Sequence, residues 1–205
     1  KHGIHEMYEL DKDVMHYLAV YNENYPMPAK PKGVDEGIVK GLYKLREAPK
    51  GDAPLVRLIG SGPIMLQLLS AVEKLEKYGV RSEIWSATSY GELRREAMEY
   101  ERINRLNPNS EKQISWVEQN LGLIEETTVA VSDNIAAIPG LIYPWVKGDY
   151  VILGTDGFGR SDTRESLRRY FEIDSEHIVL AALSSLIKGN KLDSKVFEEA
   201  KKDLN

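Results

Sequence analysis

The chain has 205 residues, a formal net charge of −5 and no cysteine. Its length suits one domain with an attached arm, and 42% hydrophobic residues suffice to bury a core of ordinary size. An acidic chain lacks the basic surface that phosphate backbones attract, so we exclude nucleic acid as a partner. Without cysteine there are no disulfides, thiol nucleophiles or thiolate metal sites, and the composition fits a reducing cytoplasm. No apolar stretch approaches the ~20 residues that span a bilayer, so no membrane contact is expected, and no signal peptide is visible.

The first 33 residues predict a strand followed by a linker. The chain opens on Lys1 instead of methionine, and residues 14–21 are mostly apolar and rich in β-formers. A chain that starts so close to a strand is expected to have been cut from a longer one, with proteolytic maturation as the alternative. Pro26, Pro28 and Pro31 then remove backbone donors and favour an extended segment, so we place a domain boundary within residues 22–33.

Short apolar strands alternate with helices over the rest of the chain. Strands are predicted at residues 55–60, 80–87, 127–131 and 150–154. Helices are predicted at residues 63–78, 90–105, 111–121, 163–170, 175–188 and 194–204, while residues 35–45 suit either a helix or a strand. This alternation predicts an α/β fold class, a three-layer α/β/α arrangement in which helices cover both faces of a mostly parallel sheet.

A glycine turn at residues 60–62 resembles the start of a dinucleotide-binding fingerprint. Met65 stands where the third glycine would fall, and Glu83 lies within the second predicted strand instead of closing it. We therefore interpret this turn as a plain strand-to-helix connection, with a free-standing nucleotide-binding α/β protein as the alternative.

Other kinds of site have little support in the sequence. The four histidines, none placed with a carboxylate at metal-ligand spacing on a regular element, are His2, His5, His16 and His177. No Gly-x-Ser-x-Gly elbow indicates a serine nucleophile. The apolar segment 135–146, interrupted by Pro139 and Pro144, is predicted to pack as a kinked element on the sheet; a buried subunit contact is the functional alternative.

The most unusual stretch, residues 154–165, reads GTDGFGRSDTRE and leads from a predicted strand into a helix. Functional loops of α/β sheets cluster at that edge, and three glycines permit sharp turns. Asp162 and Glu165 are spaced as a variant of the capping box. The loop either only turns the chain or makes a contact, and Phe158 suits burial in a neighbouring domain or subunit. The candidate contact residues are Asp156, Phe158, Arg160, Ser161, Asp162 and Arg164; the alternative is an anion site built on Arg160, Ser161 and Arg164.

Several stretches carry a resemblance to a known family. They are residues 154–165, residues 20–45 (VYNENYPMPAKPKGVDEGIVKGLYKL), residues 57–62 (RLIGSG) and residues 88–108 (TSYGELRREAMEYERINRLNP). In this order, and with the closing helices, the chain resembles the carboxy-terminal region of the homodimeric pyruvate dehydrogenase decarboxylases. These enzymes belong to the transketolase-like group that depends on thiamin diphosphate. The two long stretches are specific, whereas GSG alone is weak.

The resemblance implies a domain organisation and a cofactor outside this chain. Residues 1–25 would be the tail of the preceding pyrimidine-binding domain, residues 26–45 a proline-rich crossover, and residues 46–205 a transketolase carboxy-terminal-like domain. The family holds thiamin diphosphate and magnesium with a Gly-Asp-Gly stretch followed some 25 residues later by paired asparagines. Here the stretch at Asp156 is only a lookalike without the asparagines. We therefore expect no catalytic, cofactor-binding or metal-binding residue in this chain.

Three functions follow as hypotheses. In the first, the chain is a non-catalytic domain that supports assembly of the parent enzyme, with the remaining parent domains and a second protomer as partners. The second hypothesis is the free-standing nucleotide-binding protein. The third is a docking module for the dihydrolipoyl acetyltransferase of the complex, which the sequence does not separate from the first. Because the substrate pocket would lie outside this chain, the parent's 2-oxo acid also stays open.

Overall fold

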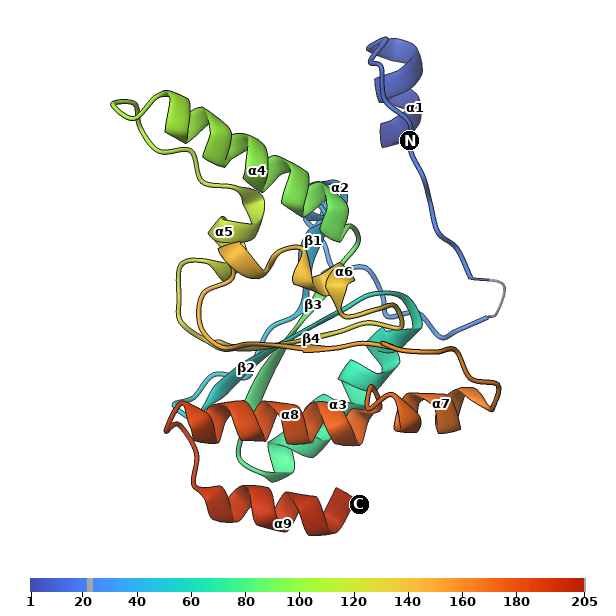
Figure 1. Cartoon of the computed structure of the whole chain (residues 1–205), viewed down its shortest axis with the longest axis vertical. Helices are drawn as coiled ribbons and strands as arrows, with labels where there is room; N and C mark the ends of the chain where they lie inside the picture. The colour runs from blue at the N-terminus through green and yellow to red at the C-terminus, as the bar shows by residue number, and fades with distance from the viewer. Residues whose placement is uncertain (22–23, 205) are drawn as a thin grey trace. The chain divides into compact units, whose positions relative to one another are not determined.

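The computed structural model describes residues 1–21 and 24–204, drawn from blue to red in Figure 1. The chain divides into two compact units, Lys1–Lys30 and Pro31–Asn205. In the first unit, helix α1 (His2–Ile4) continues as a π-helix over His5–Glu9. Glu6 lies at the centre of this unit: its carboxylate contacts His2 and His16 at 3.1 Å and Lys12 at 2.8 Å. The hydrogen bond from Lys12 is the main cause that lowers the pKa of Glu6.

The strand predicted at residues 14–21 is wrong, because these residues form neither helix nor strand. A strand has to pair its N–H and C=O groups with a neighbouring strand, and the described residues of this unit contain none. Met15 and Tyr17 are 94% and 92% exposed. In the linker predicted at residues 22–33, Asn22 and Glu23 lie outside the described residues, and residues 24–33 contain no helix or strand.

The second unit is built on a five-stranded sheet. Its strands are β1 (Leu42–Arg46), β2 (Leu55–Gly60), β3 (Arg81–Ala87), β4 (Thr127–Val131) and β5 (Tyr150–Leu153). The strand order is β1-β3-β2-β4-β5, with β1 antiparallel to β3 and the other pairs parallel. The four strands predicted from residue 55 onward are confirmed, and the ambiguous residues 35–45 supply both a helix and most of β1.

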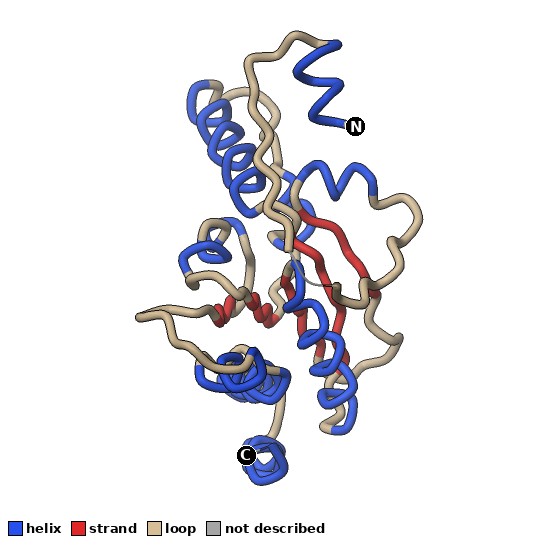
Figure 2. Tube along the Cα trace, turned by 90° about the vertical axis from the view of Figure 1, so that its right-hand side faces the viewer, coloured by secondary structure: helices blue, strands red, loops and turns tan. Residues whose placement is uncertain are grey.

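Helices cover both faces of this sheet. They are α2 (Asp35–Lys40), α3 (Met65–Lys77), α4 (Tyr90–Leu106), α5 (Trp116–Leu121), α6 (Ala137–Gly140), α7 (Arg164–Tyr170), α8 (Ser175–Lys188) and α9 (Ser194–Leu204), with 3₁₀ turns at Gly62–Ile64 and Tyr143–Trp145. Figures 1 and 2 show α9, which leads to the carboxyl terminus, beyond α8 and farther from the sheet. The three-layer α/β/α fold class is confirmed.

Helix α5 is shorter than the helix predicted at residues 111–121. The Asn104 side chain donates to the Gln113 carbonyl oxygen at 2.8 Å and accepts from the Gln113 N–H at 2.9 Å. These two bonds occupy the backbone C=O and N–H of Gln113, so Gln113 does not need helical hydrogen bonds. Ser115 then caps α5 and forms a reciprocal capping box with Glu118.

Side chains of successive strand residues enter two separate cores. Val56 and Leu58 of β2 point to the core under α3 and α8, whereas Ile59 points to the core under α4 and α5. This alternation is the period of two of a β-strand, here buried on both faces.

A cluster of charged residues is buried next to the core under α4 and α5. Arg57 and Glu83, only 5% and 7% exposed, lie side by side on β2 and β3, with Arg57 Nε 3.4 Å from Glu83 Oε1. Glu83 also accepts from Trp85 Nε1 at 2.8 Å and pairs with Lys44 Nζ of β1 at 3.0 Å. Arg57 donates to the carbonyl oxygen of Leu121, which ends α5. This cluster therefore ties β1, β2, β3 and α5 together.

We predict that Glu83→Gln destabilises the fold by about 3–5 kcal/mol, because it leaves the buried cation of Arg57 without its carboxylate. The loss is measured as the change in unfolding free energy in urea. Glu47→Gln is the matched control, since Glu47 also pairs with Lys44 but its side chain is 78% exposed. This control is expected to cost less than about 1 kcal/mol. Equal losses in the two variants would contradict the role assigned to the buried cluster.

Candidate functional site

The candidate loop at residues 154–163 has a rigid base. It follows β5, and neighbouring hydrogen bonds tie it to the loop that follows β4. The Thr155 N–H donates to the Asn134 carbonyl oxygen at 2.9 Å, and the Ala136 N–H donates to Asp156 Oδ2 at 3.1 Å. Because β4 and β5 are parallel neighbours, their carboxyl ends bring both loops to one edge of the sheet. The side chain of Asp156 thus joins the two loops through a hydrogen bond.

Glycine is required at the base of this loop. A Cβ atom at Gly154 would lie 2.5 Å from the backbone nitrogen of Ala136 and 2.9 Å from the carbonyl oxygen of Asn134. Farther along, Gly157 adopts a φ of +99°, in the left-handed region that side chains disfavour. Gly154 therefore permits the close approach of the loop after β4, whereas Gly157 permits the left-handed turn.

The tip of the loop presents one large apolar side chain. Phe158 is 96% exposed and follows the left-handed turn at Gly157. Arg160 lies over the ring of Tyr170 in α7, with its guanidinium carbon 4.2 Å from the ring centroid. Tyr170 meets Phe171 edge-on at 5.0 Å, and Phe171 packs against the buried core. Arg160 is thereby held against the body while Phe158 points away from it.

The predicted cap of α7 is corrected by the structure. Thr163 is the N-cap, and its Oγ1 accepts from the Ser166 N–H at 3.2 Å. Asp162 instead accepts from the Thr163 N–H at 2.7 Å, just outside the helix, and Glu165 lies in the first turn. The capping position thus lies one residue later than the spacing of Asp162 and Glu165 indicates.

The structure places five of the six candidate residues on one exposed loop and Arg164 at the start of the helix that follows, and it gives them different surroundings. Asp156, Arg160 and Asp162 have the partners given above, Ser161 is exposed, and Arg164 is the first residue of α7. The chemistry of the loop is that of a contact surface: an exposed aromatic group beside a stacked guanidinium and two carboxylates.

A polar depression of about 840 Å³ lies between α3, α7 and α8. Within it, Lys74 Nζ donates to Ser175 Oγ at 2.6 Å and is ion-paired with Glu176. Burial acts to raise the pKa of Glu176, but the hydrogen bonds from Lys74 and Ser175 prevail and hold the pKa below its ordinary value. Because Lys74 is engaged by a carboxylate, it does not serve Ser175 as a base. The cluster joins α3 to α8.

The single histidine of the second unit also has a structural task. Asp174 caps α8, and its Oδ1 accepts from the His177 N–H at 2.9 Å. The same oxygen lies 2.6 Å from His177 Nδ1, and Arg169 lies 3.4 Å from the other carboxylate oxygen. This acid–histidine pair is therefore committed to the helix terminus.

Two tyrosines are buried in the core, Tyr90 at the start of α4 and Tyr150 at the start of β5. Burial raises the pKa of both Tyr90 and Tyr150, and the neighbouring Tyr90 adds to the effect at Tyr150. Tyr150 donates its hydroxyl hydrogen to the Pro139 carbonyl oxygen at 2.9 Å. Among the described residues the Tyr90 hydroxyl has no hydrogen-bond partner. Both phenols stay neutral and belong to the core.

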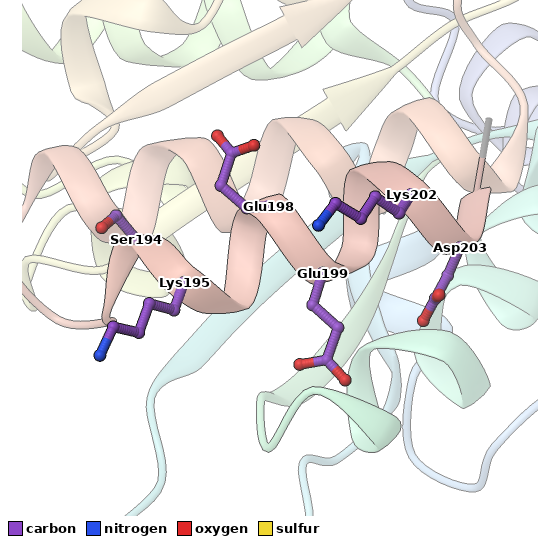
Figure 3. Close-up of a pocket in the computed structure, with 6 residues that line it drawn as sticks. All are labelled: Ser194, Lys195, Glu198, Glu199, Lys202 and Asp203. Atoms are coloured by element: carbon purple, nitrogen blue, oxygen red, sulfur yellow. The ribbon is translucent and has the colours of Figure 1, made fainter.

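A depression of about 380 Å³ lies along α9. Figure 3 shows the side chains that line it. The six side chains drawn there all come from this helix: Ser194, Lys195, Glu198, Glu199, Lys202 and Asp203. Charged residues three and four positions apart on one exposed helix form a solvated face. The depression therefore does not mark a binding site.

The remaining motifs have structural explanations. A Cβ at Gly60 would lie 2.7 Å from Ile64 Cγ2, so this glycine permits the close approach of the 3₁₀ turn and α3 to β2. Across residues 1–21 and 24–204, no group of three or more His, Asp or Glu residues is placed to hold a metal ion. No helix in that part of the chain is long and apolar enough to cross a membrane. In the segment 135–146, Ile142 and Trp145 are buried against the sheet as predicted.

Comparisons with known proteins agree with this fold. A family model described as the transketolase-like TK C-terminal domain matches residues 41–174. The chain belongs to this family. The chain is also similar to a crystal structure of transketolase from Pichia stipitis, with a TM-score of 0.53 over 77% of this chain and 20% of that one. At 17% identity this likeness concerns the fold alone.

Two relatives match nearly the whole of this chain in sequence. The chain is 42% identical over 202 residues to the pyruvate dehydrogenase E1 component of Pseudomonas aeruginosa, covering 98% of this chain and 23% of the relative. It is likewise 42% identical over 201 residues to that of Escherichia coli K12, covering 97% of this chain and 22% of the relative. The resemblance stated from the sequence motifs is confirmed. The chain spans less than a quarter of the length of these relatives.

We predict that Gly154→Ala destabilises the fold by about 1–3 kcal/mol, because the added methyl group meets backbone atoms that have no room to move. Thermal unfolding followed by circular dichroism measures the loss. Gly159→Ala is the control from the same loop, since a Cβ there meets nothing within 4 Å. If both variants melt at the wild-type temperature, the base of the loop is not rigid.

Proposed function

We propose that this chain serves as the carboxy-terminal domain of a thiamin-diphosphate-dependent pyruvate dehydrogenase. The parent enzyme would decarboxylate pyruvate oxidatively and pass the acetyl group to lipoyl groups. The observation that carries the proposal is the 42% identity over 98% of this chain to a pyruvate dehydrogenase E1 component. Nucleotide binding by a free-standing protein loses its support, because Met65 is buried and the glycine turn is explained by packing.

The proposed domain organisation keeps residues 1–25, 26–45 and 46–205 as tail, crossover and carboxy-terminal domain. The division of the chain between Lys30 and Pro31 supports a boundary in the proline-rich stretch. Strand β1 lies at the end of the proposed crossover and pairs with β3, so the crossover leads directly into the sheet. The fully exposed apolar residues near Tyr17 support the assignment of the first unit to a neighbouring domain.

We propose that this domain supports assembly and does not perform the chemistry. Asp174, which contacts His177, caps a helix, Lys74 is engaged by Glu176, and the loop at Asp156 is not followed by paired asparagines. Thiamin diphosphate and magnesium would lie in the other domains of the parent enzyme. The partners we propose are those domains, a second protomer and the dihydrolipoyl acetyltransferase, in the cytoplasm.

The isolated chain is expected neither to bind thiamin diphosphate nor to decarboxylate pyruvate, because the sequence after Asp156 lacks the paired asparagines that would hold a magnesium diphosphate. Titration calorimetry with thiamin diphosphate and magnesium measures this directly. The complete parent enzyme is the positive control. Micromolar binding to the 205-residue chain would contradict the assignment of roles.

We propose that the loop with Asp156, Phe158, Arg160, Ser161, Asp162 and Arg164 is an inter-domain or inter-subunit contact. The nearly complete exposure of Phe158 supports this role, because burying such a side chain in a neighbour stabilises an interface by roughly 1.5–3 kcal/mol. The stacking of Arg160 on Tyr170 supports a polar group held at the rim.

Phe158→Ala in the complete enzyme should weaken dimerisation or lower the thermal midpoint while single-turnover decarboxylation stays near the wild-type rate. Analytical ultracentrifugation and rapid-quench kinetics measure the two effects. Arg160→Ala is expected to have a smaller effect on assembly, since its guanidinium lies at the rim. Should Arg160→Ala abolish the chemistry while Phe158→Ala leaves assembly unchanged, the loop is part of the active site and not a contact.

A further inference from the structure

A second surface, on α4, is independent of the loop at Phe158. Figure 1 shows α4 leading away from the sheet, with α6 beside its first half. Between α4 and the segment from α6 to the 3₁₀ turn lies a groove of about 470 Å³. Its lining residues are Arg94, Met98 and Glu101 from α4, and Ala137, Gly140, Leu141, Pro144 and Trp145 from the opposite wall. One wall is thus apolar, and the other carries a cation, a thioether and a carboxylate.

Apolar side chains are exposed on both elements that form this groove. Met98, on α4, is 46% exposed, and Ile138 and Tyr143, from the segment that forms the opposite wall, are exposed as well. A thioether side chain is flexible enough to fill an irregular apolar groove, so Met98 suits insertion into a facing surface.

The charges on α4 are paired unevenly. Arg95 pairs with Glu92, and Arg102 lies 3.8 Å from Glu99, both within the helix. In the part of the chain that the structure describes, Arg94 has no carboxylate partner. Glu101 accepts from Trp145 Nε1 through Oε1 at 2.8 Å. A carboxylate has lone pairs for further donors, so Glu101 has capacity left for a guanidinium.

The spacing of these residues is self-complementary. Arg94 and Glu101 line the same groove and stand at equal distances on either side of the midpoint between Ala97 and Met98, about 5 Å along the helix axis. A two-fold axis through that midpoint would place two copies of α4 antiparallel. Arg94 would then face the partner's Glu101, its own Glu101 would face the partner's Arg94, and the two Met98 side chains would meet near the axis. An isologous interface makes every such contact twice.

We propose that the face of α4 that carries Arg94, Met98 and Glu101 is a homotypic contact, in which α4 of a second copy of the chain packs at the mouth of this groove in an antiparallel arrangement. The occupant is a second copy because the charge pattern matches itself under a two-fold rotation. The surface is small compared with standard protein interfaces, so the isolated chain self-associates weakly. In a larger assembly, this contact would add to others made elsewhere.

A cysteine placed at residue 98 tests the geometry, because the chain contains no cysteine of its own. The 205-residue Met98→Cys variant, oxidised with copper phenanthroline at low ionic strength, should form a disulfide-linked dimer. Glu99→Cys is the matched control, exposed on the same helix but turned by about 100°. Dimer yield at least roughly tenfold higher at residue 98 than at residue 99 supports the contact. Equal yields, or none at residue 98, overturn it.

Charge exchange tests the pairing by sedimentation velocity of the same chain. Arg94→Glu should weaken self-association by roughly tenfold or more, because two pairs per dimer become repulsive. The double variant Arg94→Glu/Glu101→Arg restores opposite charges across the axis and should return the association to within about threefold of wild type. Arg95→Glu, which reverses a charge already paired within the helix, is the control. Circular dichroism verifies that each variant is folded. If a charge variant unfolds, the crosslinking of Met98→Cys still tests the contact. A double variant that stays as weak as Arg94→Glu overturns the proposal.

Discussion

The two-sided burial of β2 is the constraint on which the rest of the structure depends. This strand is paired with β3 on one edge and with β4 on the other, and its side chains enter both cores. Water therefore reaches neither its backbone nor its faces, and each face requires its own layer of helices. Arg57, in the middle of the strand, places a cation in this interior, and Glu83 and the carbonyl oxygen at the end of α5 supply its partners at the same depth. The position of α5 and of the edge strand β1 follows from that requirement.

Much of this fold is readable from residue patterns, because strands buried on both faces appear as continuous apolar runs. Residues 127–131 illustrate this, since β4 begins and ends where the pattern does. The same pattern misled at residues 14–21, because an apolar extended segment becomes a strand only where a neighbour supplies hydrogen bonds. The start of α5 was missed because the Asn104 side chain replaces helical hydrogen bonds at Gln113, and that contact depends on how α4 is oriented.

The candidate loop was recognisable from its glycines and its place after a strand, whereas its internal organisation was not. Asn134 and Ala136, which hold its base, lie some twenty residues earlier, and only the adjacency of β4 and β5 brings them near. Asp162 and Thr163 are both good N-cap residues, and the backbone conformation selects Thr163. Tyr170 carries no local signal, because its role depends on Arg160 folding back across α7. The groove beside Met98 depends likewise on the packing of α6 against α4.

The separation between the base and the tip of that loop has an evolutionary consequence. Gly154 is enclosed by backbone atoms, so natural selection for stable folding acts strongly on it. A side chain at residue 159 would meet nothing, and Phe158 is almost wholly exposed, so folding is indifferent to what stands there. Substitutions at the tip are therefore filtered only by what the loop touches outside its own unit. Such a surface can diverge in step with a neighbour while the sheet that carries it stays unchanged.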